Sequence, residues 1–265
     1  MRLGWLTDLH LNFAPGSVRA ALRDDLRSHR LDALAITGDI GEARTVIWYL
    51  EEMASELAMP IYFVLGNHDF YRGSMAAVRE AVERKCAQSQ WLRWMPANGV
   101  VTLTGSTALI GHDSWADGRC GDFFHSTVEL NDYYQISELL NLDRAERYAR
   151  LNALGDEAAA FLEARLREAI ALRPRVLALT HVPPFRESCW HEGRISADDW
   201  LPHFACRAVG ERLAEVMTQH PDRSLTVLCG HTHGAGEARI LENLLVLTGG
   251  AEYGSPRLQR VIEVE

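Results

Sequence analysis

The chain repeats one arrangement, in which a short apolar run is followed at once by an aspartate, an asparagine or a histidine. Such runs have the length and composition of buried β-strands, and they cover residues 2–6, 34–36, 61–65, 176–179 and 225–228. Segments with helical spacing of apolar residues lie between them. Because strands and helices alternate along the chain, the sequence predicts a layered α/β fold.

Apolar spacing and the residues at segment ends predict the remaining elements. A first helix is expected to be capped by Ser17, and further helices are expected at residues 42–58, 74–90, 157–171 and 206–219. Two apolar runs on either side of Gly105-Ser106 predict a hairpin of residues 100–104 and 107–110. Further strands are predicted at residues 244–247 and 258–264.

The other parts of the chain are less regular. Residues 182–203 contain prolines and little periodicity, which predicts a long loop. Residues 113–155 are irregular at first and helical in their second half, and they are expected to form a cap-like insertion. No repeat, low-complexity tract or change of composition marks a linker, so residues 1–265 are predicted to form a single domain.

Charge and cysteine content narrow the class of protein. The net charge of -9 disfavours broad binding to nucleic-acid phosphates or to an anionic membrane surface. The five cysteines form no CxxC pair, which favours reduced thiols. No charged amino-terminal region precedes a long apolar stretch, and no apolar run reaches the length of a membrane span. We therefore expect a cytoplasmic protein without a membrane partner.

Potential metal ligands follow the apolar runs directly. They are Asp8, His10, Asp39, Asn67, His68, His181, His231 and His233. Ligands of α/β folds bind at the carboxyl ends of strands, so residues that are far apart in sequence are expected to meet there. A single histidine is more often structural, but the coincidence of this whole set with strand ends predicts one site. Oxygen and imidazole donors without cysteine suit Mn, Fe or Zn.

The chain resembles the calcineurin-like metallophosphoesterases in motifs that occur in the expected order: Asp8-x-His10, Gly38-Asp39, Gly66-Asn67-His68-Asp69, His181 and Gly230-His231-x-His233. The resemblance implies an α/β four-layer sandwich, in which two mixed sheets lie face to face between outer helices. It also implies two metal ions at the carboxyl edge of the strands. One ion would be held by Asp8, His10, Asp39 and His233, and the other by Asp39, Asn67, His181 and His231.

A bridging carboxylate is also expected on electrostatic grounds. Two divalent cations roughly 3.5–4 Å apart repel each other, and a shared carboxylate reduces this repulsion. Asp39 suits this place because Gly38 and Gly41 leave its backbone free. Asp39 and Asp8 together carry two negative charges against the positive charges of two divalent cations. The remaining positive charge of about +2 attracts phosphate and lowers the pKa of a bridging water toward ~7. The predicted reaction is hydrolysis of a phosphodiester or a small phosphomonoester by a metal-bridging hydroxide.

His68 is the residue predicted to transfer a proton. It stands between Asn67, a predicted ligand, and Asp69, which is expected to orient the imidazole and stabilise its protonated form. The imidazolium would donate to the leaving alkoxide or stabilise charge on the phosphoryl oxygens. Asn67 and His68 are also expected to contact substrate, together with His112 at the rim. Arg186 is a further candidate for a phosphate oxygen, with a solvated loop arginine as the alternative.

The second and third motifs bear on the substrate. Protein phosphatases of this superfamily carry Gly-Asp-x-x-Asp-Arg-Gly and Gly-Asn-His-Glu, whereas this chain has Gly38-Asp39-Ile40-Gly41-Glu42-Ala43-Arg44 and Gly66-Asn67-His68-Asp69. It therefore looks more like the bacterial phosphodiesterase-type members. The expected partner is a small phosphorylated substrate, with a nucleotide among the candidates. A nuclease and a non-catalytic scaffold of the same fold are the alternatives.

Two further groups of residues have two interpretations each. The aromatic residues of the irregular segment either pack or form a cap that stacks on a base or aryl group, and they are Trp115, Phe123, Phe124, Tyr133 and Tyr134. Histidines outside the motifs are expected to be structural or solvent-facing, and they are His29, His125, His191, His203 and His220.

Overall fold

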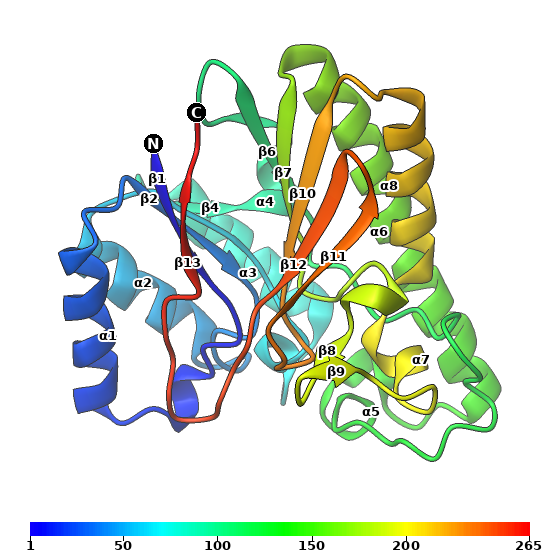
Figure 1. Cartoon of the computed structure of the whole chain (residues 1–265). Helices are drawn as coiled ribbons and strands as arrows, with labels where there is room; N and C mark the ends of the chain where they lie inside the picture. The colour runs from blue at the N-terminus through cyan, green and yellow to red at the C-terminus, as the bar shows by residue number, and fades with distance from the viewer.

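The computed structural model describes residues 1–265 and contains two β-sheets that lie face to face (Figure 1). The first sheet has the order β13-β1-β2-β3-β4, with strands at Arg260–Glu263, Arg2–Leu6, Ala33–Thr37, Ile61–Val64 and Leu92–Trp94. The second has the order β11-β12-β10-β7-β6-β5, with strands at Gly236–Leu241, Leu244–Thr248, Ser224–Cys229, Arg175–Leu179, Thr107–Gly111 and Val101–Thr102. Both sheets are mixed, because β13, β11 and β5 run antiparallel to their neighbours and the other pairs are parallel.

Helices cover the outer face of each sheet (Figure 1). The first sheet is covered by α1 (Gly16–Ser28), α2 (Val46–Leu57) and α3 (Met75–Ala87), and the second by α6 (Arg144–Leu172) and α8 (Arg207–Gln219). Shorter elements occupy the connections: α4 (Met95–Asn98), α5 (Asp132–Gln135), α7 (Leu201–Phe204), and a hairpin of β8 (Trp190–His191) and β9 (Arg194–Ile195). None of the helices combines the length and the apolar character that crossing a bilayer requires. The predicted four-layer α/β sandwich is confirmed.

The central part of the core lies between the two sheets. Leu3, Trp5 and Ala35 of the first sheet pack in one cluster with Leu179 and Leu228 of the second. All of β2 is buried, as is typical of parallel strands that are covered on both faces. This packing holds the carboxyl ends of β1, β2 and β3 beside those of β7 and β10, which is where the predicted ligands follow.

The buried carboxylate of Asp113 ties these strand ends together. Its Oδ1 accepts hydrogen bonds from the backbone N–H of Leu65 at 2.8 Å and from Nε1 of Trp94 at 2.9 Å. Its Oδ2 pairs with Nε of Arg79 at 3.1 Å, and its backbone carbonyl accepts from the N–H of His181 at 3.1 Å. The polar groups of this side chain are therefore satisfied inside the protein, and Asp113 holds the residues that follow β3 and β7 in place.

Two helix starts differ from the sequence prediction. Ser17 does not cap α1, because the helix begins one residue earlier and Pro15 stands at the N-cap position. The second predicted helix begins at Val46, not at residue 42, because Thr45 closes a turn by accepting from the backbone N–H of Glu42 at 3.1 Å. Local side-chain hydrogen bonds compete with the first helical turn in this way.

Other elements are longer than predicted or were not predicted. The helix expected at residues 157–171 is the second half of α6, which begins after a capping box formed by Asp143 and Glu146. The strands β4 and β11 and the β8–β9 hairpin were not predicted. The hairpin lies within the loop predicted for residues 182–203. The strands β4, β8 and β9 have only two or three residues each, too few for an alternating pattern to be recognised from sequence.

Candidate metal centre

Most of the candidate ligands occupy a left-handed turn directly after a strand. Positive φ angles between 42° and 71° occur at Asp8, His10, Asp39, His231 and His233. Residues other than glycine rarely adopt this backbone conformation, which costs roughly 1–3 kcal/mol at each position. The chain leaves β1, β2 and β10 sharply at these residues, and their side chains are turned toward one region at the carboxyl edge of the sheets.

The first group of donors consists of Asp8, His10, Asp39 and His233. One donor atom of each residue lies within 4.8 Å of the others. The two Nε2 atoms of His10 and His233 are 3.1 Å apart, and Oδ1 of Asp8 lies 3.6 Å from Nε2 of His233. These are the residues that the sequence assigned to one metal ion, and the fold brings all four together.

The second group places Asn67, His181 and His231 together. Nδ1 of His181 lies 2.8 Å from the carbonyl oxygen of Thr37, and Nε2 of His231 lies 3.0 Å from that of His203. Because a carbonyl only accepts, these nitrogens carry the hydrogens, and in the neutral rings that bind metals the opposite nitrogens present lone pairs. Nε2 of His181 and Nδ1 of His231 are 2.9 and 3.0 Å from Oδ1 of Asn67. Three lone-pair donors thus meet without a hydrogen between them.

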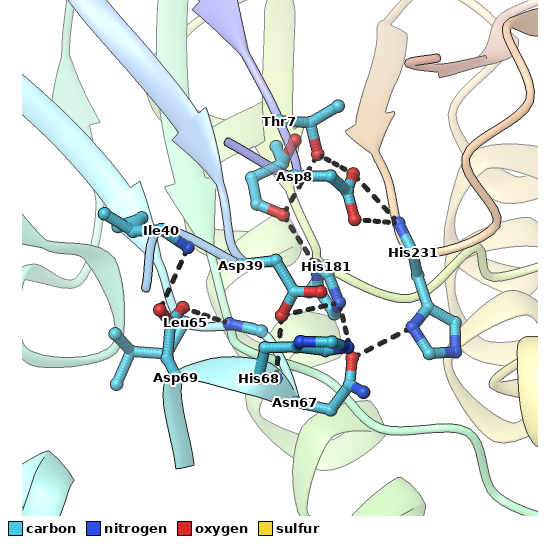
Figure 2. Close-up of polar contacts among 12 residues, drawn as sticks. Thr7, Asp8, Asp39, Ile40, Leu65, Asn67, His68, Asp69, His181 and His231 are labelled. Carbon is cyan, nitrogen blue, oxygen red and sulfur yellow. Dashed lines mark hydrogen bonds and ion pairs between the residues drawn. The ribbon is translucent and has the colours of Figure 1, made fainter. Parts of the chain in front are cut away.

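Asp39 lies between the two groups, as Figure 2 shows from its place beside His181 and His68. Its Oδ1 is 3.5 Å from Nε2 of His181, and its Oδ2 is 3.7 Å from Nε2 of His10. The backbone N–H of His68 donates to Oδ1 at 2.8 Å and fixes the carboxylate in this orientation. Each oxygen therefore faces a different group, which is the arrangement a bridging ligand needs.

Two glycines leave the space in which Asp39 and His181 approach the neighbouring backbone. A Cβ atom at Gly66 would lie 2.2 Å from Oδ1 of Asp39, and one at Gly38 would lie 2.6 Å from Nδ1 of His181. Gly38 also has a φ of +89°, which side chains rarely adopt. The Gly-Asp and Gly-Asn-His motifs therefore need their glycines for space.

The donor chemistry fits divalent cations. Burial raises the pKa of Asp39 to about 7, and burial together with the neighbouring histidines lowers the pKa of His10. A cation at this place would favour the ionised carboxylate and the neutral imidazole, which are the forms that bind metals. It would also relieve the repulsion among the lone pairs that converge at Asn67. The site is built for positive charge, and no lysine or arginine side chain lines its pocket.

His68 lies beside the two groups with its ring packed between aromatic neighbours. Its imidazole stacks on Tyr71 with 4.2 Å between ring centroids and lies edge-on to His10 at 4.6 Å. Burial lowers the pKa of His68 to about 4, against the opposing charge of Asp132. This shift favours the neutral ring, which offers one N–H as a donor.

Asp69 does not orient that ring. Its carboxylate accepts from the backbone N–H groups of Ile40 at 2.9 Å, Gly41 at 2.8 Å and Gly66 at 2.9 Å. Through these three bonds the carboxylate of Asp69 joins the turn after β2 to the turn after β3 (Figure 2). The predicted contact between Asp69 and the His68 ring is therefore corrected.

The structure does not bring His112 and Arg186 to the site. Nδ1 of His112 accepts from the N–H of Ser114 at 3.0 Å, and its ring packs against Phe161 of α6. Arg186 is exposed and pairs with Asp198. Neither residue lines the pocket beside the metal centre, and the substrate contacts predicted for them are corrected on that ground.

Several residues of the pocket were not predicted. It has a volume of about 220 Å³, and its lining includes Tyr71, Asp132, His191, Phe204 and Tyr253 as well as predicted ligands. None of them follows a long apolar run, so the pattern that identified the ligands could not identify these residues. The aromatic residues considered for a cap lie outside the lining. Three of those five side chains, Trp115, Phe123 and Tyr133, pack in the core.

Asp132 is the buried residue that orients Asn67. Its Oδ1 accepts from Nδ2 of Asn67 at 2.8 Å and from the hydroxyl of Tyr71 at 2.7 Å. Because the amide nitrogen is turned toward Asp132, the amide oxygen faces the two histidines. Asp132 belongs to the segment predicted as a cap, and it reaches the site from outside the family-like motifs.

Replacing Asp132 with alanine is expected to lower the affinity for manganese about 10- to 100-fold, since only the longer hydrogen bond to the hydroxyl of Tyr71, at 3.3 Å, then holds the amide of Asn67. Titration calorimetry with Mn²⁺ measures this affinity. The Asp132→Asn variant keeps an oxygen acceptor and is the matched control, for which we expect nearly unchanged binding. Wild-type affinity in the alanine variant would show that Asn67 needs no such support.

Comparison with known proteins agrees with this arrangement. The family model of the calcineurin-like phosphoesterases matches residues 1–235. Among solved structures, a phosphopantetheinyl hydrolase from Mycobacterium tuberculosis is 15% identical with a TM-score of 0.69, over 97% of this chain and 95% of that chain. A dimetal phosphatase from Danio rerio is 15% identical with a TM-score of 0.58, over 94% and 87%.

A purple acid phosphatase from yellow lupin seeds is 13% identical with a TM-score of 0.52, over 100% of this chain and 46% of that chain. At such identities the likeness concerns the fold. The curated protein sequences that were compared give no match. The family model covers most of the chain, including every predicted ligand. The chain therefore belongs to the calcineurin-like phosphoesterase family and is a metal-dependent phosphoester hydrolase.

Proposed function

We propose that the chain hydrolyses small phosphodiesters at a centre of two metal ions held by the two groups of donors. The observation that carries this proposal is the charge of the pocket. It is lined by the carboxylates Asp39 and Asp132 and by histidines, without lysine or arginine. A phosphomonoester carries nearly two negative charges at neutral pH and a diester carries one. Beside the metal ions, the pocket offers no cationic side chain for the second charge, and this favours the diester.

The residues around the centre divide the work. Bound metal ions would supply an acidified water and neutralise charge on the phosphoryl oxygens. Asp39 would bridge the two sites, and Asn67 and the histidines of the two groups would hold the ions. His68 donates an N–H to an oxygen of the phosphoryl or leaving group. The oxygen and imidazole donors favour Mn, Fe or Zn as the metals.

The size and charge of the site argue for a small substrate. A volume of about 220 Å³ accommodates a phosphoryl group and part of one ester substituent. Long nucleic acids are disfavoured by the net charge of -9 and by the absence of basic side chains from the pocket. A cyclic nucleotide or another compact diester is the proposed substrate class.

The proposal is tested by comparing bis-p-nitrophenyl phosphate with p-nitrophenyl phosphate in the presence of Mn²⁺. We expect a higher kcat/KM for the diester and loss of both activities on chelation, because the pocket stabilises one negative charge better than two. A phosphopantetheine ester belongs in the same panel, given the solved phosphopantetheinyl hydrolase of this fold.

The reverse preference would contradict the assignment as a diesterase while leaving a metal-dependent phosphatase. Activity that persists after chelation and removal of the metals by gel filtration would contradict the metal requirement itself. The His125→Ala variant is a suitable control for each measurement, since that side chain is exposed and pairs only with its neighbour Asp122.

A further inference from the structure

The chain crosses from the second sheet to the first beside the candidate metal centre. The crossing segment joins the end of β12 to the start of β13, and it is anchored on both sides. The N–H of Ala251 donates to the carbonyl of His233 at 3.1 Å. The amide side chain of Gln259 makes two hydrogen bonds with the backbone of Gly250, at 3.0 and 2.9 Å. Tyr253 lies within this anchored segment.

The ring of Tyr253 forms one wall of the pocket. It lies 4.4 Å from the ring of His10 between centroids and 5.2 Å from that of His233. The ring of Phe13 packs edge-on against it at 5.0 Å with an interplanar angle of 72°. Phe13 and Tyr253 are nevertheless 52% and 51% exposed. Two adjacent aromatic side chains are thus held in place beside the donors while half of their surface faces solvent.

Pocket size places the rest of a substrate against this wall. The volume of about 220 Å³ is smaller than the ~300–1,000 Å³ of pockets that enclose a whole ligand. A substrate with its phosphoryl group at the metal centre must therefore extend its organic part over the rim. At the rim, Tyr253 presents a flat surface next to the phosphoryl position. Flat aromatic surfaces bind planar rings by stacking, and they do so with little preference among bases.

We infer that Tyr253 is a stacking platform that selects phosphate esters carrying a planar aromatic ring, such as nucleoside phosphates, at this site. The inference rests on the proposed function, and it narrows the substrate class of the same site. Tyr253 lies beyond residues 1–235, which the family model matches, so this preference is a property of the chain's own carboxyl-terminal segment.

The test compares two ligands that differ only in the base, adenosine 5′-monophosphate and ribose 5-phosphate, which stand for the monoester products that diester hydrolysis releases. Titration calorimetry on the manganese-loaded protein measures their affinities, and an assay for released inorganic phosphate checks that neither ligand is hydrolysed during the titration. We expect adenosine 5′-monophosphate to bind about tenfold more tightly to the wild type, which corresponds to ~1.4 kcal/mol of stacking. The Tyr253→Ala variant should lose this tenfold preference and bind ribose 5-phosphate as before. The Tyr253→Phe variant keeps the ring and should keep the preference.

Three results would overturn the inference: equal affinities in the wild type, an equal loss of both affinities in Tyr253→Ala, or the same loss of preference in Tyr253→Phe. The side chain is half exposed, so its removal leaves the core intact and circular dichroism should report an unchanged fold. Failure of the diesterase proposal is seen separately, in the comparison of diester and monoester turnover, because the calorimetric readout does not depend on hydrolysis.

Discussion

Replacing Asp39 with asparagine is expected to reduce turnover by about 10³-fold and to lower the number of metal ions bound per chain. The substitution preserves the shape of the side chain and removes one negative charge from the point between the two donor groups. Asp39 is buried, and its two oxygens face His181 and His10 at 3.5 and 3.7 Å. Two cations close together would then repel each other without a carboxylate between them.

Metal content is measured by inductively coupled plasma mass spectrometry after loading with Mn²⁺ and gel filtration, and turnover on bis-p-nitrophenyl phosphate. The Asp122→Asn variant is the matched control, because it makes the same chemical change at an exposed carboxylate. If Asp39→Asn retained two ions and wild-type turnover, the bridging role would have to be abandoned.

Replacing His68 with alanine is expected to lower turnover by about 10²- to 10⁴-fold while the metal content stays at the wild-type level. The imidazole belongs to neither donor group, and its ring is held by stacking on Tyr71 and by an edge contact with His10. Its removal takes away a hydrogen-bond donor at the pocket. The two sets of metal donors remain in place.

Turnover and metal content, measured together, distinguish proton donation by His68 from a structural role. A His68→Gln variant retains an N–H donor and should recover part of the lost turnover. Loss of metal in His68→Ala would assign the residue to the metal centre instead. Full turnover without the imidazole would exclude it from the chemistry.

The fold and the family were predictable because the signal was local. Each short apolar run is a strand. A parallel strand that is buried on both faces, such as β2, is recognised from its continuous apolar residues alone. The residues that follow β1, β2, β3, β7 and β10 were identified by their position alone. Their approach to one another depends on the shared edge of parallel strands, which is a general property of such sheets.

The residues that were misplaced show the limit of this reasoning. His112 also follows a strand, but its ring packs against Phe161 of α6 and its Nδ1 accepts from the N–H of Ser114. Asp69 is adjacent to His68 in sequence, yet its carboxylate is turned toward three backbone N–H groups. Neighbours along a tight turn point in different directions, so adjacency does not establish a contact.

The sequence by itself determined the layered α/β fold, the family, and the identity of the residues that could bind metal, because strand periodicity and polar residues at strand ends are local properties. Only the tertiary structure decided that Asp132 orients Asn67 and that Tyr253 forms the wall beside His10. These side chains come from connections whose paths depend on how the two sheets and their helices pack. Contacts between residues 65 or more positions apart leave no pattern in a single sequence when only one of the partners lies at a strand end.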